Sequence, residues 1–306
     1  MQIQSLLAVT DLSVEGDRAV HRAAMLAAQH RALLKIMYAP GDFAGSDRSD
    51  VKEGTARLAA EVHKRFDILV KNVSNIGGNL QAVVEEARWV DMLVMSERRE
   101  RCATAFFLGQ PIERLQRVIA CPILLVRLEV ARGYRRILVA VDFTPESKKL
   151  VELAWSLERN AQVQLFHALT PSHLGKLRYN EAPEQAIKTY PRERMRDAYE
   201  RVFYLTDSST ARRNRVFAAI GRGDAGRQAV IQQEHAEAEL LVVGKRRTSS
   251  FADFIFGSVA QRVLWCSTGD VLLVPHDLRI VPQIETQTVP VSCEPWIARF
   301  EDRRAA

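Results

Sequence analysis

The sequence predicts an α/β protein with two tandem open sheets of five parallel strands each, covered by helices on both faces. Three observations lead to this prediction. The chain has 306 residues, which is enough for two domains that each bury a core. An internal repeat divides it into two similar halves, and in each half short apolar runs alternate with segments of helical periodicity. Strands separated by helices pair in parallel through right-handed crossovers.

The repeat is visible at the start and at the end of each half. The run LLAVTDLS at 6–13 matches ILVAVDFT at 137–144, and both contain an aspartate followed two positions later by a hydroxyl residue. Further along, residues 91–126 align without a gap with residues 239–274. This repeat predicts a first domain at 1–128, a second domain at 134–276 and an extended C-terminal tail at 277–306.

The first strand and helix of the second half have clear local signals. Residues 135–142 are apolar and β-branched enough for a strand that is buried on both faces. Thr144 follows as a predicted N-cap, Pro145 suits the first helical position, and Glu146 faces the helix dipole. Four apolar residues at the spacing i, i+3, i+4 and i+7 then predict a helix with one buried face: Leu150, Leu153, Ala154 and Leu157.

The remaining elements continue the alternation. In the second half, the sequence predicts strands at 163–169, 214–223, 239–243 and 270–275 and helices at 192–205, 224–237 and 257–266. In the first half, it predicts strands at 33–39 and 68–74, a helix after Ser13 and a helix at 78–88.

The last strand of each half would be an exposed apolar sheet edge, at 121–128 and at 270–275. Such an edge invites pairing with another strand, so proteins cover it. Because fusion raises the effective concentration of the second domain, we expect the two edges to pair antiparallel within one chain. The expected architecture is therefore an intramolecular pseudo-dimer, with homodimerisation through other surfaces left open.

Composition and charge argue against several other classes of protein. No apolar run approaches the roughly 18 residues needed to span a bilayer, and the N-terminus lacks the basic region of a secretory signal. We therefore expect no membrane contact and a cytoplasmic location. The net charge is +6, but acidic residues interrupt nearly every basic cluster, so nucleic-acid binding is not expected. The four cysteines and seven histidines show no metal-ligand spacing.

A spaced motif follows the fourth strand of the second half. Gly244 is followed by two residues and Arg247, then by nine residues, Gly257 and Ser258, while Asp142 ends the first strand. With this motif and the order of elements, residues 1–276 resemble two tandem universal stress protein domains, as in the two-domain stress proteins of bacteria. The family fingerprint is Gly, two residues, Gly, nine residues, Gly and Ser or Thr.

The resemblance implies an adenine nucleotide alpha hydrolase-like fold and a role in stress survival, usually without established catalysis. Some members of the family bind ATP through the glycine-rich loop and others do not. Members also commonly pair their domains through the last strands. The parallel sheet would bring Asp142, Gly244 and Gly257 to one edge, where open α/β sheets bind ligands.

The sequence departs from the fingerprint at the glycines. In the second half, Arg247 replaces the second glycine, and in the first half the corresponding positions are Ser96, Arg99, Gly109 and Gln110. A residue other than glycine costs about 1–2 kcal/mol in a left-handed conformation. Arg247 also places a long side chain where a triphosphate would lie. Two readings stay open: the cations of Lys245, Arg246 and Arg247 replace lost phosphate contacts, or they form a solvated basic loop.

The candidate ligand-binding residues are Asp142, Thr144, Gly244, Arg246, Arg247, Gly257, Ser258 and Val259. Asp142 can meet the ribose or adenine edge of adenosine, or it can be satisfied by nearby backbone. Ser258 can cradle a phosphate or simply cap a helix.

The sequence offers no catalytic candidate, because it contains no Ser–His–Asp arrangement, carboxylate pair or Walker-type loop. We expect a universal stress protein that is not an enzyme, binds proteins or a small ligand, and binds ATP weakly. The alternative is a nucleotide-binding regulatory switch that uses the loop of the second domain. No cofactor is expected, ATP being the alternative, and the protein partners are not identified by the sequence.

Overall fold

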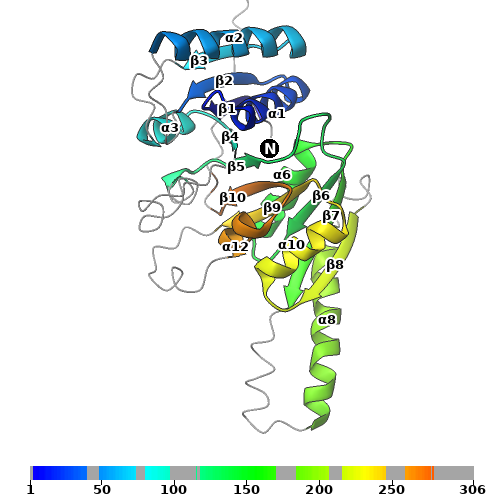
Figure 1. The fold of residues 1–306 in the computed structure, drawn as a ribbon. Helices are drawn as coiled ribbons and strands as arrows, with labels where there is room; N and C mark the ends of the chain where they lie inside the picture. Colours follow the sequence, from blue (N-terminus) through cyan, green and yellow to red (C-terminus); the bar gives the residue numbers. More distant parts are fainter. Residues whose placement is uncertain are drawn as a thin grey trace, which may run out of the picture.

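The computed structural model describes residues 3–39, 48–73, 80–96, 115, 118–169, 184–206, 216–245, 259–276 and 278. Their strands form a single ten-stranded sheet that runs through both halves of the chain (Figure 1). The strand order is β3-β2-β1-β4-β5-β10-β9-β6-β7-β8. The tail predicted at 277–306 lies outside the described residues apart from Leu278, which packs against the apolar core.

The first half supplies five strands in the order that the repeat predicts. Its elements are β1 (Ser5–Thr10), α1 (Val14–His30), β2 (Leu33–Tyr38), α2 (Arg48–Phe66), β3 (Val70–Val73), α3 (Leu80–Ala87), β4 (Met92–Ser96) and β5 (Ile123–Val126).

The second half repeats this arrangement. Its elements are β6 (Arg136–Ala140), α6 (Glu146–Leu157), β7 (Gln162–Leu169), α8 (Glu184–Thr206), β8 (Val216–Arg222), α10 (Ala225–His235), β9 (Leu240–Lys245), α12 (Val259–Cys266) and β10 (Asp270–Pro275).

The two halves meet at the pairing of β5 with β10. Every other pairing between the described strands is parallel, whereas this one is antiparallel, with Leu124 opposite Leu272. Each residue of β5 and of β10 is buried. The predicted antiparallel pairing of the two final strands is therefore present, and it makes one sheet from the two.

The sheet separates two apolar cores, because successive side chains of a strand point to opposite faces. One core packs α1, α2, α6 and α8 against one face, with Leu6, Ile137 and Val242 among its strand residues. The other packs α3, α10 and α12 against the opposite face, with Leu7 and Val243 among its strand residues. Helices on both faces of a mostly parallel sheet confirm the predicted fold class.

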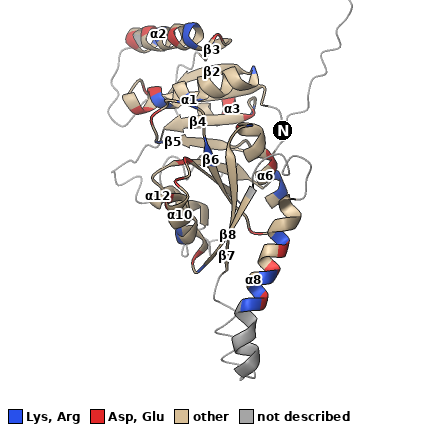
Figure 2. Cartoon of the chain, turned by 90° about the vertical axis from the view of Figure 1, so that its right-hand side faces the viewer, with Lys and Arg blue, Asp and Glu red and all other residues tan. Residues whose placement is uncertain are grey.

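Helix α8 differs from the prediction, because it begins at Glu184 rather than at 192. Residues 184–191 lack a repeating apolar face, so hydrophobic periodicity could not reveal them. The helix projects beyond the sheet (Figure 1) and carries basic and acidic side chains along its described length (Figure 2). Arg196 pairs with Glu200 and Arg201 with Asp197 at helical spacing. Helix α8 thus packs one face on the core and presents a salt-bridged face to solvent.

A buried polar cluster fastens the junction of the two halves. The Asp270 carboxylate accepts hydrogen bonds from the backbone N–H groups of Arg127 (2.8 Å) and Leu128 (2.9 Å) and from the Tyr134 hydroxyl (2.6 Å). Arg22 on α1 lies 3.5 Å from the same carboxylate and donates to the Arg132 carbonyl at 2.8 Å. The side chains of Arg22 and Asp270 are 4% and 0% exposed, so this ion pair is shielded from water.

Candidate ligand-binding site

The candidate site is a cavity of about 580 Å³ at the carboxyl ends of the strands in the second half. It lies where β6 and β9 are neighbours. From β6 the chain proceeds through α6 to β7 on one side, and it returns through α10 to β9 on the other side. This is the topological switch point of the sheet, where open α/β sheets bind ligands.

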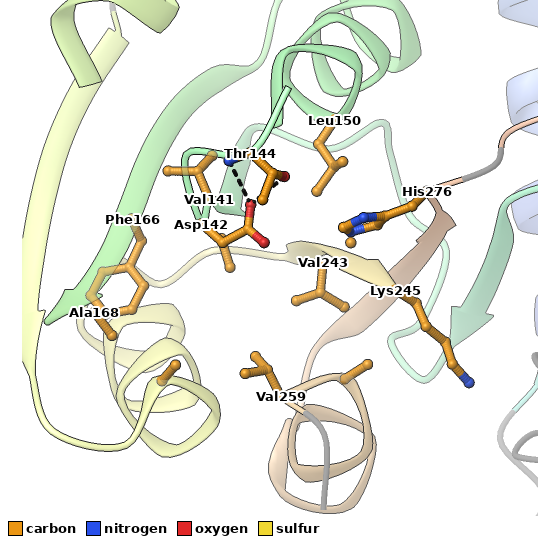
Figure 3. A pocket seen from close by; sticks show the side chains of 14 residues that line it. Val141, Asp142, Thr144, Leu150, Phe166, Ala168, Val243, Lys245, Val259 and His276 are labelled. Carbon is orange, nitrogen blue, oxygen red and sulfur yellow. Dashed lines mark hydrogen bonds between the residues drawn. The ribbon is translucent and has the colours of Figure 1, made fainter. Parts of the chain in front are cut away.

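Most of the residues that line the cavity are apolar, with a few polar side chains among them (Figure 3). The lining residues are Ala140, Val141, Asp142, Thr144, Leu150, Phe166, Ala168, Ala225, Val243, Gly244, Lys245, Val259, Ala260 and His276. Such a lining, with a small number of placed polar groups, is typical of small-molecule sites.

A tight turn after β6 orients Asp142 at the cavity. Its Oδ1 atom accepts hydrogen bonds from the Thr144 backbone N–H (3.1 Å), the Thr144 hydroxyl (2.7 Å) and the Ser147 hydroxyl (2.9 Å). Phe143, between them, has a left-handed φ of 60°. Three donors on one oxygen fix the carboxylate before any ligand arrives.

The environment keeps Asp142 ionised. Burial raises the pKa of its carboxyl, but the hydrogen bonds from Thr144 and Ser147 and the nearby His276 outweigh burial and hold this pKa below its ordinary value. An ionised carboxylate only accepts hydrogen bonds. The site therefore offers an acceptor to any ligand near Asp142.

The turn after β6 is also supported by a contact with β7, on the face of that strand that points away from the cavity. The Phe143 ring packs on the His167 imidazole with their centroids 4.2 Å apart. His167 Nδ1 is 2.8 Å from the Val141 carbonyl oxygen, and burial lowers the pKa of the imidazole. Since Phe166 and Ala168 face the cavity, the strand period places His167 on the other face.

The first half builds the same turn with a different helix start. Asp11 accepts hydrogen bonds from the backbone and hydroxyl of Ser13, and Leu12 has a φ of 62°. The Ser13 oxygen also accepts from the Gly16 N–H at 3.1 Å, so Ser13 caps α1. Asp11 is thus an acid satisfied by its own turn.

The prediction that Thr144 caps its helix through its side chain is wrong. The N-cap of α6 is Pro145, which makes no side-chain capping bond. The Thr144 hydroxyl donates to Asp142, and the Ser147 N–H bonds to the backbone carbonyl of Thr144 at 3.0 Å. Thr144 thus serves the turn that presents Asp142.

His276 packs directly on Gly244 at the end of β9. Its backbone N–H donates to the Lys245 carbonyl at 2.9 Å, which extends the β9–β10 ladder by one residue. A Cβ on residue 244 would lie 2.9 Å from His276 Nε2 and 3.2 Å from a Leu150 methyl. In Figure 3 the imidazole points into the cavity, across from Phe166.

The structure brings four of the eight predicted ligand-binding residues together. Asp142, Thr144, Gly244 and Val259 all line the cavity. The other four, Arg246, Arg247, Gly257 and Ser258, lie outside the described residues. In the first half, Ser96 ends β4, and Arg99, Gly109 and Gln110 lie outside the described residues.

Sequence reasoning missed several lining residues. Phe166 and Ala168 could have been found, because alternation within 163–169 places them on one face of their strand. His276 was assigned to the end of the domain, although the residue after a parallel strand always lies at the ligand-binding edge. Ala225 begins α10, and the sequence predicted that helix without linking its start to the site.

Other chemical features are sparse in the described part of the chain. No group of three or more His, Cys, Asp and Glu side chains there is arranged to hold a metal ion. Nor is any helix in that part long and apolar enough to cross a membrane.

Fold and cavity together define a tandem α/β protein with a cavity at the switch point in the second half of its sheet. The chain belongs to the universal stress protein family: the family model matches residues 2–127 and again residues 133–275. A search of curated proteins gives no match.

Solved structures of similar fold cover both halves. A universal stress protein from Archaeoglobus fulgidus matches with a TM-score of 0.62 and 15% identity, covering 89% of this chain and 96% of that chain. A functionally unknown protein from Pseudomonas aeruginosa matches with a TM-score of 0.63 and 20% identity, covering 90% and 93%. A universal stress protein in complex with cAMP covers 47% of this chain and 99% of its own, with 24% identity and a TM-score of 0.33.

Proposed function

We propose that this universal stress protein is not an enzyme and that its second domain binds a small organic ligand in the switch-point cavity. The observation that carries the proposal is the combination of an ionised, pre-oriented carboxylate at Asp142 with largely apolar walls. The cavity volume of about 580 Å³ falls within the range of small-molecule sites. Binding would then serve the stress response through recognition rather than turnover.

The walls indicate the kind of ligand. Asp142 would accept hydrogen bonds from hydroxyl or amino groups of the ligand. Phe166, Val243 and Val259 would contact an apolar body. A molecule with one apolar part and one hydrogen-bond donor group satisfies both surfaces.

The hydroxyl groups beside the cavity support a role without catalysis. Thr144 and Ser147 both donate to Asp142, the arrangement in which a carboxylate could activate a nucleophile. A carboxylate whose pKa lies below its ordinary value is, however, a weak base at neutral pH. These hydroxyls therefore support the orientation of Asp142.

The alternative function is a nucleotide-dependent switch, and one observation favours it: Gly244 and Val259, at the two ends of the glycine-rich loop, both border the cavity. Against it stands Arg247 in place of the second fingerprint glycine. We expect ATP to bind with a Kd weaker than about 100 µM, which is less than about 5.5 kcal/mol of binding free energy, and without magnesium-dependent turnover. Low-micromolar binding in calorimetric titration would favour the switch.

A pair of filling variants tests the ligand site. Ala168→Leu places extra carbon atoms in the cavity. Ala39→Leu makes the same change at the equivalent position after β2 of the first half. Each purified protein is denatured and searched for released small molecules by mass spectrometry. We expect the same molecule from the wild type and from Ala39→Leu, and its loss from Ala168→Leu. A molecule retained equally by all three proteins would contradict the proposed site.

A further inference from the structure

In this chain, steric contacts disfavour a side chain at Gly244, near the end of β9. Among the described residues, Gly223 is the glycine with a positive φ, so Gly244 is not required by a left-handed backbone. A side chain at 244 would instead collide with the His276 ring at 2.9 Å and press on Leu150 at 3.2 Å. A side chain at 244 would therefore have to displace the imidazole of His276.

That position is where a ligand would approach the backbone most closely. Gly244 follows the buried part of β9 at the switch point, and its missing side chain would leave the main chain open to the cavity. Glycine often serves to let a ligand come close to the backbone. Here, a side chain of the protein itself occupies the space.

The fold positions the backbone of His276 beside Gly244. His276 follows β10, and its N–H bond to the Lys245 carbonyl fixes the Cα position one residue beyond the strand. Its side chain is half-buried and packs beside Leu150. Figure 3 shows the ring on the side of the cavity opposite Phe166, so the open volume lies between these two rings.

We propose that His276 is the specificity-determining residue of this cavity, closing the space over Gly244 against extended ligands. This inference rests on the proposed ligand site and narrows its ligand class. The occupant is a compact molecule that fits between Asp142, Phe166 and Val259 while Gly244 stays covered. A long polyanion that must run along the end of β9 is excluded by a steric clash, which is how specific sites reject unwanted ligands.

Calorimetric titration of four proteins with ATP and with adenosine tests the proposal. His276→Ala removes the ring, and His276→Gln keeps a side chain of similar reach. His235→Ala removes an exposed histidine at the far end of α10 from the cavity-lining Ala225 and serves as the matched control. We expect His276→Ala to bind ATP at least about tenfold more tightly than the wild type, a gain of about 1.4 kcal/mol. The affinity for adenosine should change less, and the other two variants should bind both ligands with the affinity of the wild type.

Two results would overturn the proposal. ATP affinity that is unchanged or lower in His276→Ala would show that the ring does not block the cavity. Equal tightening in His276→Gln would show that size is not the cause. Both results are affinities for added ATP. They can therefore be interpreted even if the filling variants release no native ligand.

A stability measurement checks the packing itself. Gly244→Ala should destabilise the wild type, because the new methyl group meets the imidazole at 2.9 Å. The same change in the His276→Ala background should cost measurably less. Equal costs in the two backgrounds would mean that the ring does not lie against Gly244, and the steric argument would fail.

Discussion

At the scale of single residues, Asp142 and Asp11 show how one turn serves two purposes. Both aspartates follow the first strand of their half and accept hydrogen bonds from a hydroxyl residue two positions on. Ser147 adds a third donor to Asp142, whereas Gly16 occupies the equivalent position in the first half. The hydroxyl of Ser147 thus strengthens the turn that borders the cavity.

Replacing Asp142 by Asn should lower the free energy of unfolding by about 1 kcal/mol at neutral pH, because charge-assisted hydrogen bonds are lost. The folded-state pKa of Asp142 lies below 3.8, so its contribution exists above that pH and disappears as pH falls through the folded-state value. The difference in the free energy of unfolding between wild type and variant should therefore become smaller as the solution is made acidic. Urea denaturation from pH 7 downward measures it.

The control for this prediction is Asp197→Asn on α8. Asp197 makes an exposed ion pair with Arg201, which contributes at most about 0.5 kcal/mol. A difference for Asp142→Asn that stays constant at all pH values would contradict the prediction, since it would then come from packing and not from the ionised carboxylate.

The sequence identified Asp142 and Gly244 because both stand at strand ends that a parallel sheet brings to one edge. It could not identify why Gly244 is a glycine. The side chain that lies against Gly244 is that of His276, which is 32 positions away and follows another strand. Local sequence pattern says nothing about such a contact, so the motif could not show that a histidine ring packs on its first glycine.

At the scale of elements, strands were easier to predict than helix ends. Buried strands such as β9 and β10 contain continuous apolar runs that locate them, although β9 extends to Lys245, two residues beyond its predicted end. Helix α6 was placed well by its apolar spacing, but its cap was misassigned, since Thr144 has two possible hydrogen-bond partners at short range. Helix α8 was shortened in the prediction because the sequence of residues 184–191 shows no repeating apolar spacing.

The end of α1 offers a test at this scale. Its C-cap, Arg31, adopts a left-handed conformation with φ of 55°, and its N–H bonds to the Ala27 and Ala28 carbonyls. This conformation costs a residue other than glycine about 1 kcal/mol. Arg31→Gly should therefore raise the free energy of unfolding by about 0.5–1 kcal/mol.

Arg31→Ala is the matched control, because it removes the same exposed side chain but keeps the Cβ atom. It should give no gain in the midpoint of urea denaturation. If both variants stabilise the protein equally, the gain comes from loss of the arginine and not from relief of the backbone.

At the scale of the whole molecule, the pairing of β5 with β10 makes the two halves share one sheet. The sequence predicted this pairing, since each final strand is too apolar to remain an exposed sheet edge. The polar cluster around Asp270 could not be predicted. Arg22, Tyr134 and Asp270 are separated by more than 100 positions in sequence, and no periodicity links them.

This cluster predicts that the halves unfold together. Asp270→Ala would leave buried the Arg22 charge, the Tyr134 hydroxyl and two backbone N–H groups that the carboxylate now satisfies. Breaking a buried ion pair in this way costs about 3–5 kcal/mol. Hydrogen exchange should then show the backbone amides of β5 and β10 losing protection together, although only β10 contains the altered residue.

Asp224→Ala supplies the comparison. Asp224 caps α10 in the second half and pairs with Arg262, and neither belongs to the polar cluster around Asp270, so its loss should cost about 1 kcal/mol. Protection of β5 should fall much less in Asp224→Ala than in Asp270→Ala. If Asp270→Ala lowers protection in β10 and leaves β5 as in the wild type, the cluster does not couple the two halves, and the antiparallel strand pairing alone holds the molecule together.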